Sequence, residues 1–172
     1  MFLFVCISVG VIFLDQLTKW LTVIFLDPKM PVSVIEWFIR FRYVENTGAA
    51  WGMFGAPDQR WIFMTLSTVA IVAILLYVFI MKPKSRLLRT SLAFIVGGGI
   101  GNMIDRVLLG YVVDFLEFTF IEFPVFNVAD SFVCIGAALM ILYLLSDTVK
   151  EYKNGRKQKT DTADVKRDGD EA

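Results

Sequence analysis

Histidine is absent from this sequence, and its absence excludes several kinds of catalytic site. Neither a Ser-His-Asp triad nor a Cys-His pair can form, and zinc sites with histidine ligands, including the HExxH type, are excluded as well. Cysteine is rare, and because Cys6 and Cys134 both lie in apolar segments we expect no disulfide framework. Any catalysis must therefore rest on Asp, Glu, Lys, Ser, Tyr or Cys side chains.

The chain also has no excess of charge of either sign. Its 17 basic and 17 acidic residues give a net charge of zero, so we expect no nucleic-acid partner. Apolar residues are abundant instead: 56% of the 172 residues are hydrophobic and the mean hydropathy is +0.63, which is unusual for a soluble domain. The predicted fold class is an α-helical integral membrane protein with four transmembrane helices, at residues 1–26, 61–81, 90–109 and 126–146.

Basic residues are distributed unevenly among the connections between these helices. The loop KPKSRLLR at 82–89 carries four basic residues and no acid, and the C-terminal segment 147–172 carries seven basic residues. Because positively charged loops stay in the cytoplasm, we expect both termini and this loop to be cytoplasmic and the other two connections to lie outside. We also expect a membrane-embedded domain over 1–149 and a disordered cytoplasmic tail over 150–172.

The two connections expected outside have the pattern of extended structure. Pro28 and Pro31 end the first helix, after which apolar side chains alternate with others over 39–44, as in a half-buried strand. Asn-Thr-Gly at 46–48 is typical of a turn. Residues 110–125 are rich in β-branched and aromatic side chains, which also favour extended structure.

Two charged residues interrupt the first apolar segment. Asp15 and Lys19 are four residues apart on one helix face with the acid first, the favourable order for an ion pair. Two interpretations are open. The pair could neutralise two buried charges for purely structural reasons, or it could form the wall of a site and orient substrate or neighbouring helices.

The third apolar segment contains both small and polar residues. Gly97 and Gly101 have the GxxxG spacing that lets helices pack closely in a membrane. A phosphate-binding loop is the weaker interpretation, because no strand precedes these glycines and no GK[ST] follows them. Asn102 and Arg106 lie on one helix face, and Asp105 adjoins Arg106. We therefore predict a buried polar network in which Asp105 and Arg106 support a site.

Two further aspartates lie at facing ends of neighbouring apolar segments. Asp114 follows the third segment and Asp130 opens the fourth, at the same membrane face. A carboxylate near bilayer depth is costly, so it indicates a functional site. Two carboxylates in contact can share one proton and carry out acid–base chemistry. We predict that these two form a catalytic pair, and that Asn127 or Asp130 caps the fourth helix.

Two other classes of protein are compatible with this pattern. A small channel or transporter subunit would use its carboxylates to line an ion path, but internal repeats and paired broken helices are missing. A Ser-Lys peptidase would need a serine beside Lys19, and none is close to it in sequence. The approach of the Asp114 and Asp130 side chains distinguishes these classes, because an ion path would need a ladder of carboxylates across the span.

Four blocks of sequence, in order and in register with the apolar segments, resemble the lipoprotein signal peptidases, also called signal peptidase II. The resemblance covers roughly residues 10–145. The blocks are DQLTK at 15–19, NTGAAWG at 46–52, GNMIDRVLLGYVVDF at 101–115 and FNVADS at 126–131. Each block alone is a weak signal, but the four together are specific.

The resemblance implies an aspartic peptidase of the bacterial cytoplasmic membrane. Such enzymes remove the signal peptide from a prolipoprotein, cutting on the N-terminal side of a cysteine that already carries diacylglycerol. The catalytic residues implied are Asp114 and Asp130, at the extracytoplasmic face and without a metal or cofactor. The expected partners are diacylglyceryl-modified prolipoproteins and membrane lipids, and the enzyme is expected to be a monomer.

The resemblance also implies which residues bind substrate or support the site. These are Asp15, Lys19, Asn46, Gly48, Asn102, Arg106, Asn127 and Ala129. A small extracytoplasmic β-sheet, drawn from 30–60 and 110–125, would form a cradle for the lipid-modified substrate. Trp51 and Met103 stand where the family more often has Phe and Leu or Ile, and neither difference affects the chemistry.

Overall fold

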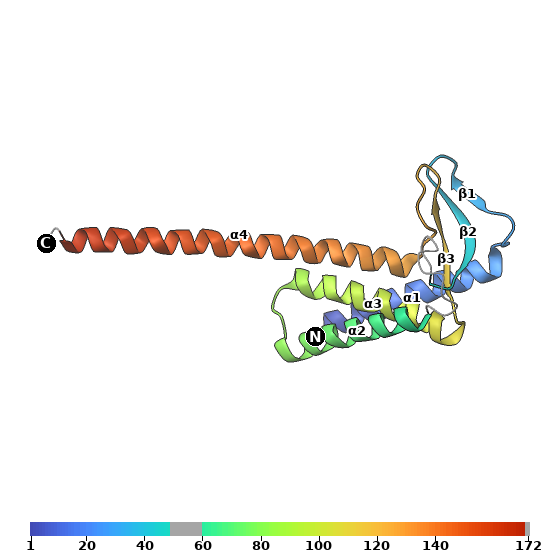
Figure 1. Ribbon diagram of the computed structural model, residues 1–172, viewed down its shortest axis with the longest axis horizontal. Helices are drawn as coiled ribbons and strands as arrows, with labels where there is room; N and C mark the ends of the chain where they lie inside the picture. Colours follow the sequence, from blue (N-terminus) through green and yellow to red (C-terminus); the bar gives the residue numbers. More distant parts are fainter. Residues whose placement is uncertain (49–59, 171–172) are drawn as a thin grey trace.

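Four long helices form the body of the molecule in the computed structural model, which describes residues 1–48 and 60–170. All four are long and apolar enough to cross a membrane, which confirms the predicted fold class. Their bounds are α1 Phe2–Phe25, α2 Arg60–Met81, α3 Arg86–Leu108 and α4 Val128–Asp170. The N-terminus and the α2–α3 connection lie at one end of the bundle, and a small sheet lies at the other (Figure 1).

Helix α3 is the central helix, because it packs against α1, α2 and α4. The predicted role of Gly97 and Gly101 in close packing is confirmed. A Cβ atom on Gly97 would lie 2.8 Å from the Cβ of Val11, and one on Gly101 would lie 2.5 Å from the Oδ2 of Asp15. The two glycines therefore let α1 approach α3 closely, and Gly101 makes room for a carboxylate.

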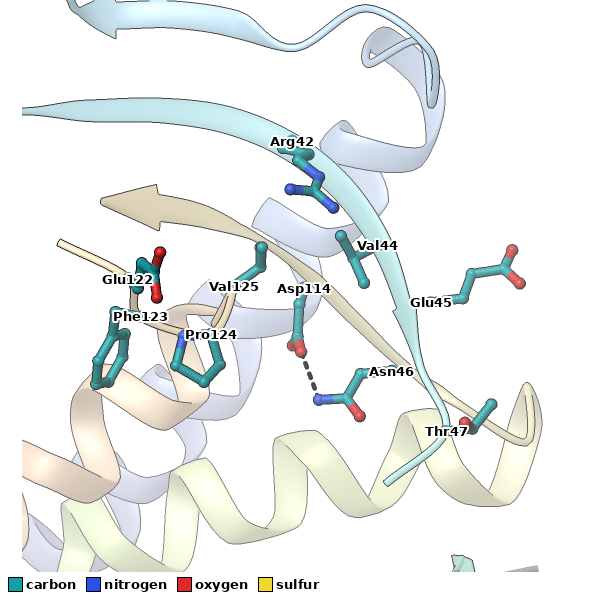
Figure 2. A pocket seen from close by; sticks show the side chains of 10 residues that line it. All are labelled: Arg42, Val44, Glu45, Asn46, Thr47, Asp114, Glu122, Phe123, Pro124 and Val125. Atoms are coloured by element: carbon teal, nitrogen blue, oxygen red, sulfur yellow. Dashed lines mark hydrogen bonds between the residues drawn. The ribbon is translucent and has the colours of Figure 1, made fainter. Parts of the chain in front are cut away.

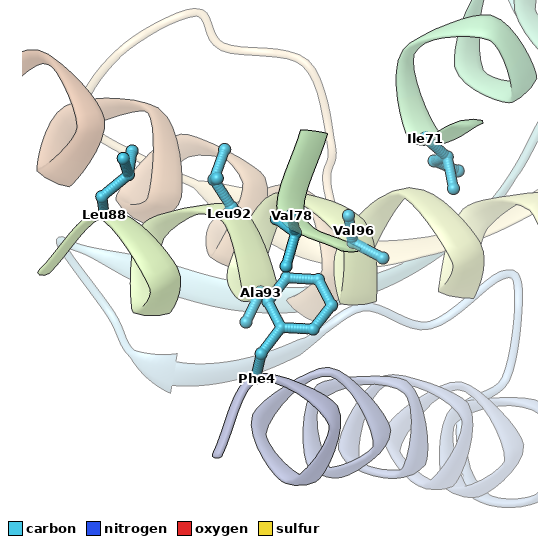
Figure 3. Close-up of a cluster of buried hydrophobic side chains, with 7 residues drawn as sticks. All are labelled: Phe4, Ile71, Val78, Leu88, Leu92, Ala93 and Val96. Atoms are coloured by element: carbon cyan, nitrogen blue, oxygen red, sulfur yellow. The ribbon is translucent and has the colours of Figure 1, made fainter. Parts of the chain in front are cut away.

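An apolar cluster joins α1, α2 and α3. Its buried members are Phe4, Ile71, Val78, Leu88, Leu92, Ala93 and Val96 (Figure 3). Most other apolar side chains on the helices face outward, as Phe13 and Ile80 do with exposures of 66% and 70%. Such an apolar exterior suits a protein whose helices are surrounded by lipid.

The sheet has three antiparallel strands in the order β1-β2-β3. Their bounds are β1 Val32–Ile35, β2 Ile39–Asn46 and β3 Val112–Phe118, so the predicted strand at 39–44 is confirmed. The strands run across the helix axes at the end of the bundle (Figure 1). Val44 is paired with Asp114 and Asn46 with Val112, which brings the end of β2 against the start of β3.

Helix α4 continues well past the bundle (Figure 1). It runs to Asp170, so residues 150–170 are helical where the sequence predicts a disordered tail. A division of the chain at residue 149 stays a prediction. The predicted turn at 46–48 has Gly48 with a φ of 118°, a conformation that favours glycine. Trp51 lies outside the described residues.

Candidate active site

Asp114 lies near the start of β3, and its side chain is almost completely excluded from solvent, with 1% exposure. Two amides donate hydrogen bonds to it: Asn46 Nδ2 lies 2.8 Å from Oδ2 and Asn127 Nδ2 lies 2.7 Å from Oδ1. Asn46 is itself oriented, because its Oδ1 accepts a hydrogen bond of 2.8 Å from the backbone N–H of Gly48. The turn at 46–48 therefore fixes which end of the Asn46 amide faces Asp114.

Asp130 lies in the first turn of α4 and is held by a reciprocal capping arrangement. The backbone N–H of Asp130 donates to Asn127 Oδ1 at 2.9 Å, and the backbone N–H of Asn127 donates to Asp130 Oδ2 at 3.2 Å. Both residues thus take part in the predicted helix cap. Asn102 Nδ2 donates to the other oxygen, Asp130 Oδ1, at 2.7 Å.

Asn127 connects the two candidate catalytic carboxylates. Its side chain is fully buried and donates to Asp114, and its backbone N–H donates to Asp130. Burial raises the pKa of the Asp114 carboxyl to about 6; the Asn46 and Asn127 hydrogen bonds oppose this rise and the negative charge of Asp130 adds to it. The two carboxylates therefore belong to one site, as the sequence predicts, and do not form a ladder across the membrane.

A buried ion cluster between α1 and α3 lies next to this site and supports it. Lys19 Nζ lies 2.9 Å from Asp15 Oδ2 and 2.9 Å from Asp105 Oδ2, and it donates to Asn102 Oδ1 at 2.8 Å. The predicted ion pair of Asp15 and Lys19 is thus confirmed. The ion-pair partner of Asp105, however, is Lys19 from α1, whereas Arg106, which adjoins Asp105 in sequence, donates to the Asn102 carbonyl.

The same contacts decide between two classes of peptidase. The ammonium of Lys19 has three N–H donors, and three acceptors surround it, two of them carboxylates. These acceptors belong to Asp15, Asp105 and Asn102, and none of the three is the serine hydroxyl that a Ser-Lys peptidase places beside its lysine. The contacts of Lys19 therefore serve to orient Asn102.

Two further contacts of the carboxylates in this cluster, both with backbone N–H groups, position the elements that carry Asp114 and Asp130. Asp15 Oδ1 accepts a 3.0 Å hydrogen bond from the backbone N–H of Ala129, at the start of α4. Asp105 Oδ2 accepts a 3.1 Å hydrogen bond from the backbone N–H of Val113, directly before Asp114. Both interpretations of Asp15 and Lys19 therefore apply, since the pair neutralises buried charge and also orients the site.

Arg106 lies at the edge of the site. Its guanidinium Nη1 donates to the Asn102 carbonyl at 3.4 Å, and its Cζ atom lies 5.7 Å from the centre of the Phe63 ring on α2. It lines a cavity of about 290 Å³ together with Asp130 and Asn102; the other lining residues are mostly apolar and come from α2, α3 and α4. We call this the inner cavity.

A second cavity, the outer cavity, lies on the sheet side of Asp114 and has a volume of about 420 Å³. Figure 2 shows Asp114 in the middle of its lining, between residues of β2 and the segment 122–125. The lining combines the polar side chains of Arg42, Asn46 and Glu122 with apolar ones, among them Val44 and Phe123. Asp130 thus lines a largely apolar cavity among the helices, and Asp114 lines a cavity of mixed character under the sheet.

Two groups at the site were not singled out from the sequence. Gln16 Nε2 donates to Asp105 Oδ1 at 2.9 Å and to the Gly101 carbonyl at 3.2 Å. Gln16 lies inside the DQLTK block, so its position beside Asp15 was the available signal. Glu117 is 9% exposed and pairs with two arginines of β2, a contact that only the strand register reveals.

Comparisons with known proteins agree with this architecture. The family model described as signal peptidase (SPase) II matches residues 7–146. A lipoprotein signal peptidase of Caldanaerobacter subterraneus subsp. tengcongensis is 48% identical over 131 residues, covering 76% of this chain and 87% of that protein. One of Bacillus subtilis is 36% identical over 153 residues, covering 88% of this chain and 98% of that protein.

The fold has relatives among solved structures. A bacterial membrane enzyme solved at 2.3 Å resolution superposes with a TM-score of 0.78 at 30% sequence identity, covering 86% of this chain and 90% of that chain. Sequence and fold therefore agree over the four helices and the sheet. The chain belongs to the signal peptidase II family, whose members are aspartic-type peptidases that act on lipoprotein signal peptides.

Proposed function

We propose that this enzyme removes signal peptides from diacylglyceryl-modified prolipoproteins by activating a water molecule between Asp114 and Asp130. The family supports lipoprotein signal peptides as the substrate. The observation that carries the mechanism is the double contact of Asn127, which holds both carboxylates in one site. The proposed cleavage is on the N-terminal side of the lipidated cysteine, and it uses no metal or other cofactor.

In the proposed reaction one carboxyl group is ionised and the other carries a proton. We assign the proton to Asp114, because burial raises its pKa. The ionised Asp130 takes a proton from water while the water oxygen attacks the scissile carbonyl carbon, and Asp114 donates its proton to the carbonyl oxygen. The C–N bond then breaks as a proton passes to the leaving amine, and both products leave without a covalent intermediate.

The amide side chains of the site suit this role. Asn46, Asn102 and Asn127 each donate to one oxygen of a catalytic carboxylate, and these contacts set the orientation of the carboxyl groups. Asn102 is itself oriented by the buried ammonium of Lys19. The arrangement is therefore organised before substrate arrives, as electrostatic catalysis requires.

The two cavities suggest how the substrate lies across the pair. The inner cavity is lined largely by aliphatic side chains of membrane-spanning helices, so it suits the apolar end of a signal peptide. The outer cavity lies under the sheet and has charged and polar side chains in its lining besides apolar ones, so it suits the mature part of the lipoprotein. We propose that the sheet is the cradle for this part and faces the extracytoplasmic side, with both termini cytoplasmic and the enzyme acting as a monomer among membrane lipids.

The experiment is the cleavage of a purified diacylated prolipoprotein by Asp114→Asn, Asp130→Asn and the double variant. Each single variant should lose activity by about 10²- to 10⁴-fold, because asparagine keeps the shape of the side chain but cannot accept and return a proton. The double variant should be no worse than either single one, since the two residues act as a unit. Substrate binding, measured separately, should be retained.

Asp27→Asn provides the control, because Asp27 is exposed and lies in the connection after α1. It should keep parental activity. Near-parental cleavage by either catalytic-site variant, or losses that multiply in the double variant, would contradict the shared-proton mechanism.

A further inference from the structure

A neighbouring recess adjoins the outer cavity, and we call the two together the trough. The recess has a volume of about 340 Å³ and is lined by Arg40, Glu117 and the segment 118–123. Glu122 and Phe123 line both the outer cavity and the recess. The trough therefore has Asp114 in the lining of one part, Glu117 in the lining of the other, and Glu122 where the two parts adjoin.

Most charged side chains of the trough are already bound within the protein. Glu117 pairs with both Arg40 and Arg42, and Arg42 Nη1 lies 2.9 Å from its Oε1. The hydrogen bond from Arg40 lowers the pKa of Glu117, so this carboxylate stays ionised between the two arginines. Glu45 points away from the cavity in Figure 2, and it accepts a 3.1 Å hydrogen bond from the hydroxyl of Tyr43.

Glu122 differs from these residues. It is exposed and lines both the outer cavity, where Figure 2 shows it, and the recess. Among the side chains that the structure describes, its carboxylate has neither an ion-pair partner nor a hydrogen-bond partner. Glu122 therefore faces the trough without a cation from those side chains, so a basic group of a ligand can pair with it.

We propose that Glu122 selects for a basic side chain among the first residues that follow the lipidated cysteine. This inference rests on the proposed function, in which the mature part of the substrate lies in the outer cavity. A lysine or arginine there meets the exposed carboxylate of Glu122. An acidic residue meets like charge, since the guanidinium groups of the trough are held by Glu117.

The expected preference is modest, because Glu122 is exposed to solvent. Ion pairs of this kind correspond to about a two- to fivefold difference in kcat/KM between a basic and a neutral substrate. The preference should shrink as salt is raised, since exposed charges are screened. The informative readout is the ratio of kcat/KM between basic and neutral substrates, because a general loss of activity leaves this ratio unchanged.

The experiment measures kcat/KM for three diacylated prolipoprotein substrates that differ only in the second to fourth residues of the mature part. All three positions are Lys in the first substrate, Gln in the second and Glu in the third. The parent enzyme should prefer the Lys substrate, Glu122→Gln should abolish most of the preference, and Glu122→Lys should invert it. Glu36→Gln is the matched control, because Glu36 is an exposed acid of the β1–β2 connection that lines neither part of the trough.

The outcomes separate this inference from the proposed function. Equal cleavage of the three substrates by the parent, or an unchanged preference in Glu122→Gln, would overturn the inference alone. An equal loss on all three substrates in both Glu122 variants would also overturn it, because Glu122 would then serve the fold or the chemistry. A parent enzyme that cleaves none of the three would refute the proposed function, and this inference with it.

Discussion

Removal of the Lys19 charge is the sharpest test of how the site is held together. The ammonium lies 2.9 Å from a carboxylate oxygen of both Asp15 and Asp105, and the three side chains are exposed by 4% or less. Lys19→Met keeps most of the length of the side chain but removes the charge and three hydrogen-bond donors. Two buried carboxylates would then face each other without their cation.

The expected cost is large for a single substitution. Removal of one partner from a buried ion pair destabilises a protein by about 3–5 kcal/mol, because the other charge stays buried and unpaired. For a chain of this size, each kcal/mol lowers the melting temperature by about 2–4 °C, so the expected decrease is on the order of 10 °C. Activity should fall as well, since Asp15 and Asp105 hold the backbone at Ala129 and Val113.

The assay is thermal unfolding of the purified enzyme in one detergent, followed by tryptophan fluorescence. Lys29→Met is the control, because Lys29 is exposed, and it should melt close to the parent. Addition of Asp105→Asn to Lys19→Met should recover part of the loss, because one of the two unpaired carboxylates is removed. Melting of Lys19→Met within about 2 °C of the parent, or no recovery in the double variant, would refute this reasoning.

Two further predictions concern pH and topology. If Asp114 carries the shared proton, kcat/KM should fall as pH rises above about 6, because the Asp114 carboxyl then loses that proton. A kcat/KM that instead rises through pH 6 to a plateau would show that Asp114 acts as the base. Single cysteines at Lys84 and Met30, in a chain lacking Cys6 and Cys134, report orientation: an impermeant thiol reagent on intact cells should label position 30 only, and labelling at 84 alone would reverse the proposed topology.

Hydropathy and residue spacing predicted the four helices, the strand at 39–44 and the charged residues of the site, whereas a site role for Asn46 came from the resemblance to the family. They did so because membrane spans need long apolar segments and because charges inside such segments are rare. Hydropathy and spacing could not predict the ion-pair partner of Asp105. Sequence adjacency pointed to Arg106, whereas helix packing turns Asp105 toward Lys19 on α1. Periodicity shows which residues share a helix face, but it does not show which faces meet.

For a related reason, the sequence did not predict that Asn127 contacts both Asp114 and Asp130. Its position before an apolar segment predicted a helix cap, and the backbone contacts with Asp130 confirm one. Its third contact, with Asp114, depends on where β3 lies, and that position follows from the pairing of β2 with β3. A strand register of this kind is set by long-range contacts that no local pattern in the chain contains.

The balance of charge around the site gives a reason for a shared proton that is independent of any single pKa. Four carboxyl groups, on Asp15, Asp105, Asp114 and Asp130, lie within one connected set of contacts. Lys19 is the buried cation of this set, and Arg106 lies at its edge beside Asp130. Four ionised carboxylates would leave the set with an excess of two negative charges in surroundings of low dielectric, which is costly.

In the proposed mechanism one shared proton halves this excess. The Lys19 ammonium lies 2.9 Å from both Asp15 and Asp105 and so compensates their charge. Asp114 and Asp130 accept hydrogen bonds chiefly from neutral amides, which carry no compensating charge. The less compensated negative charge therefore lies on the Asp114 and Asp130 pair, which is where the proposed mechanism places the shared proton.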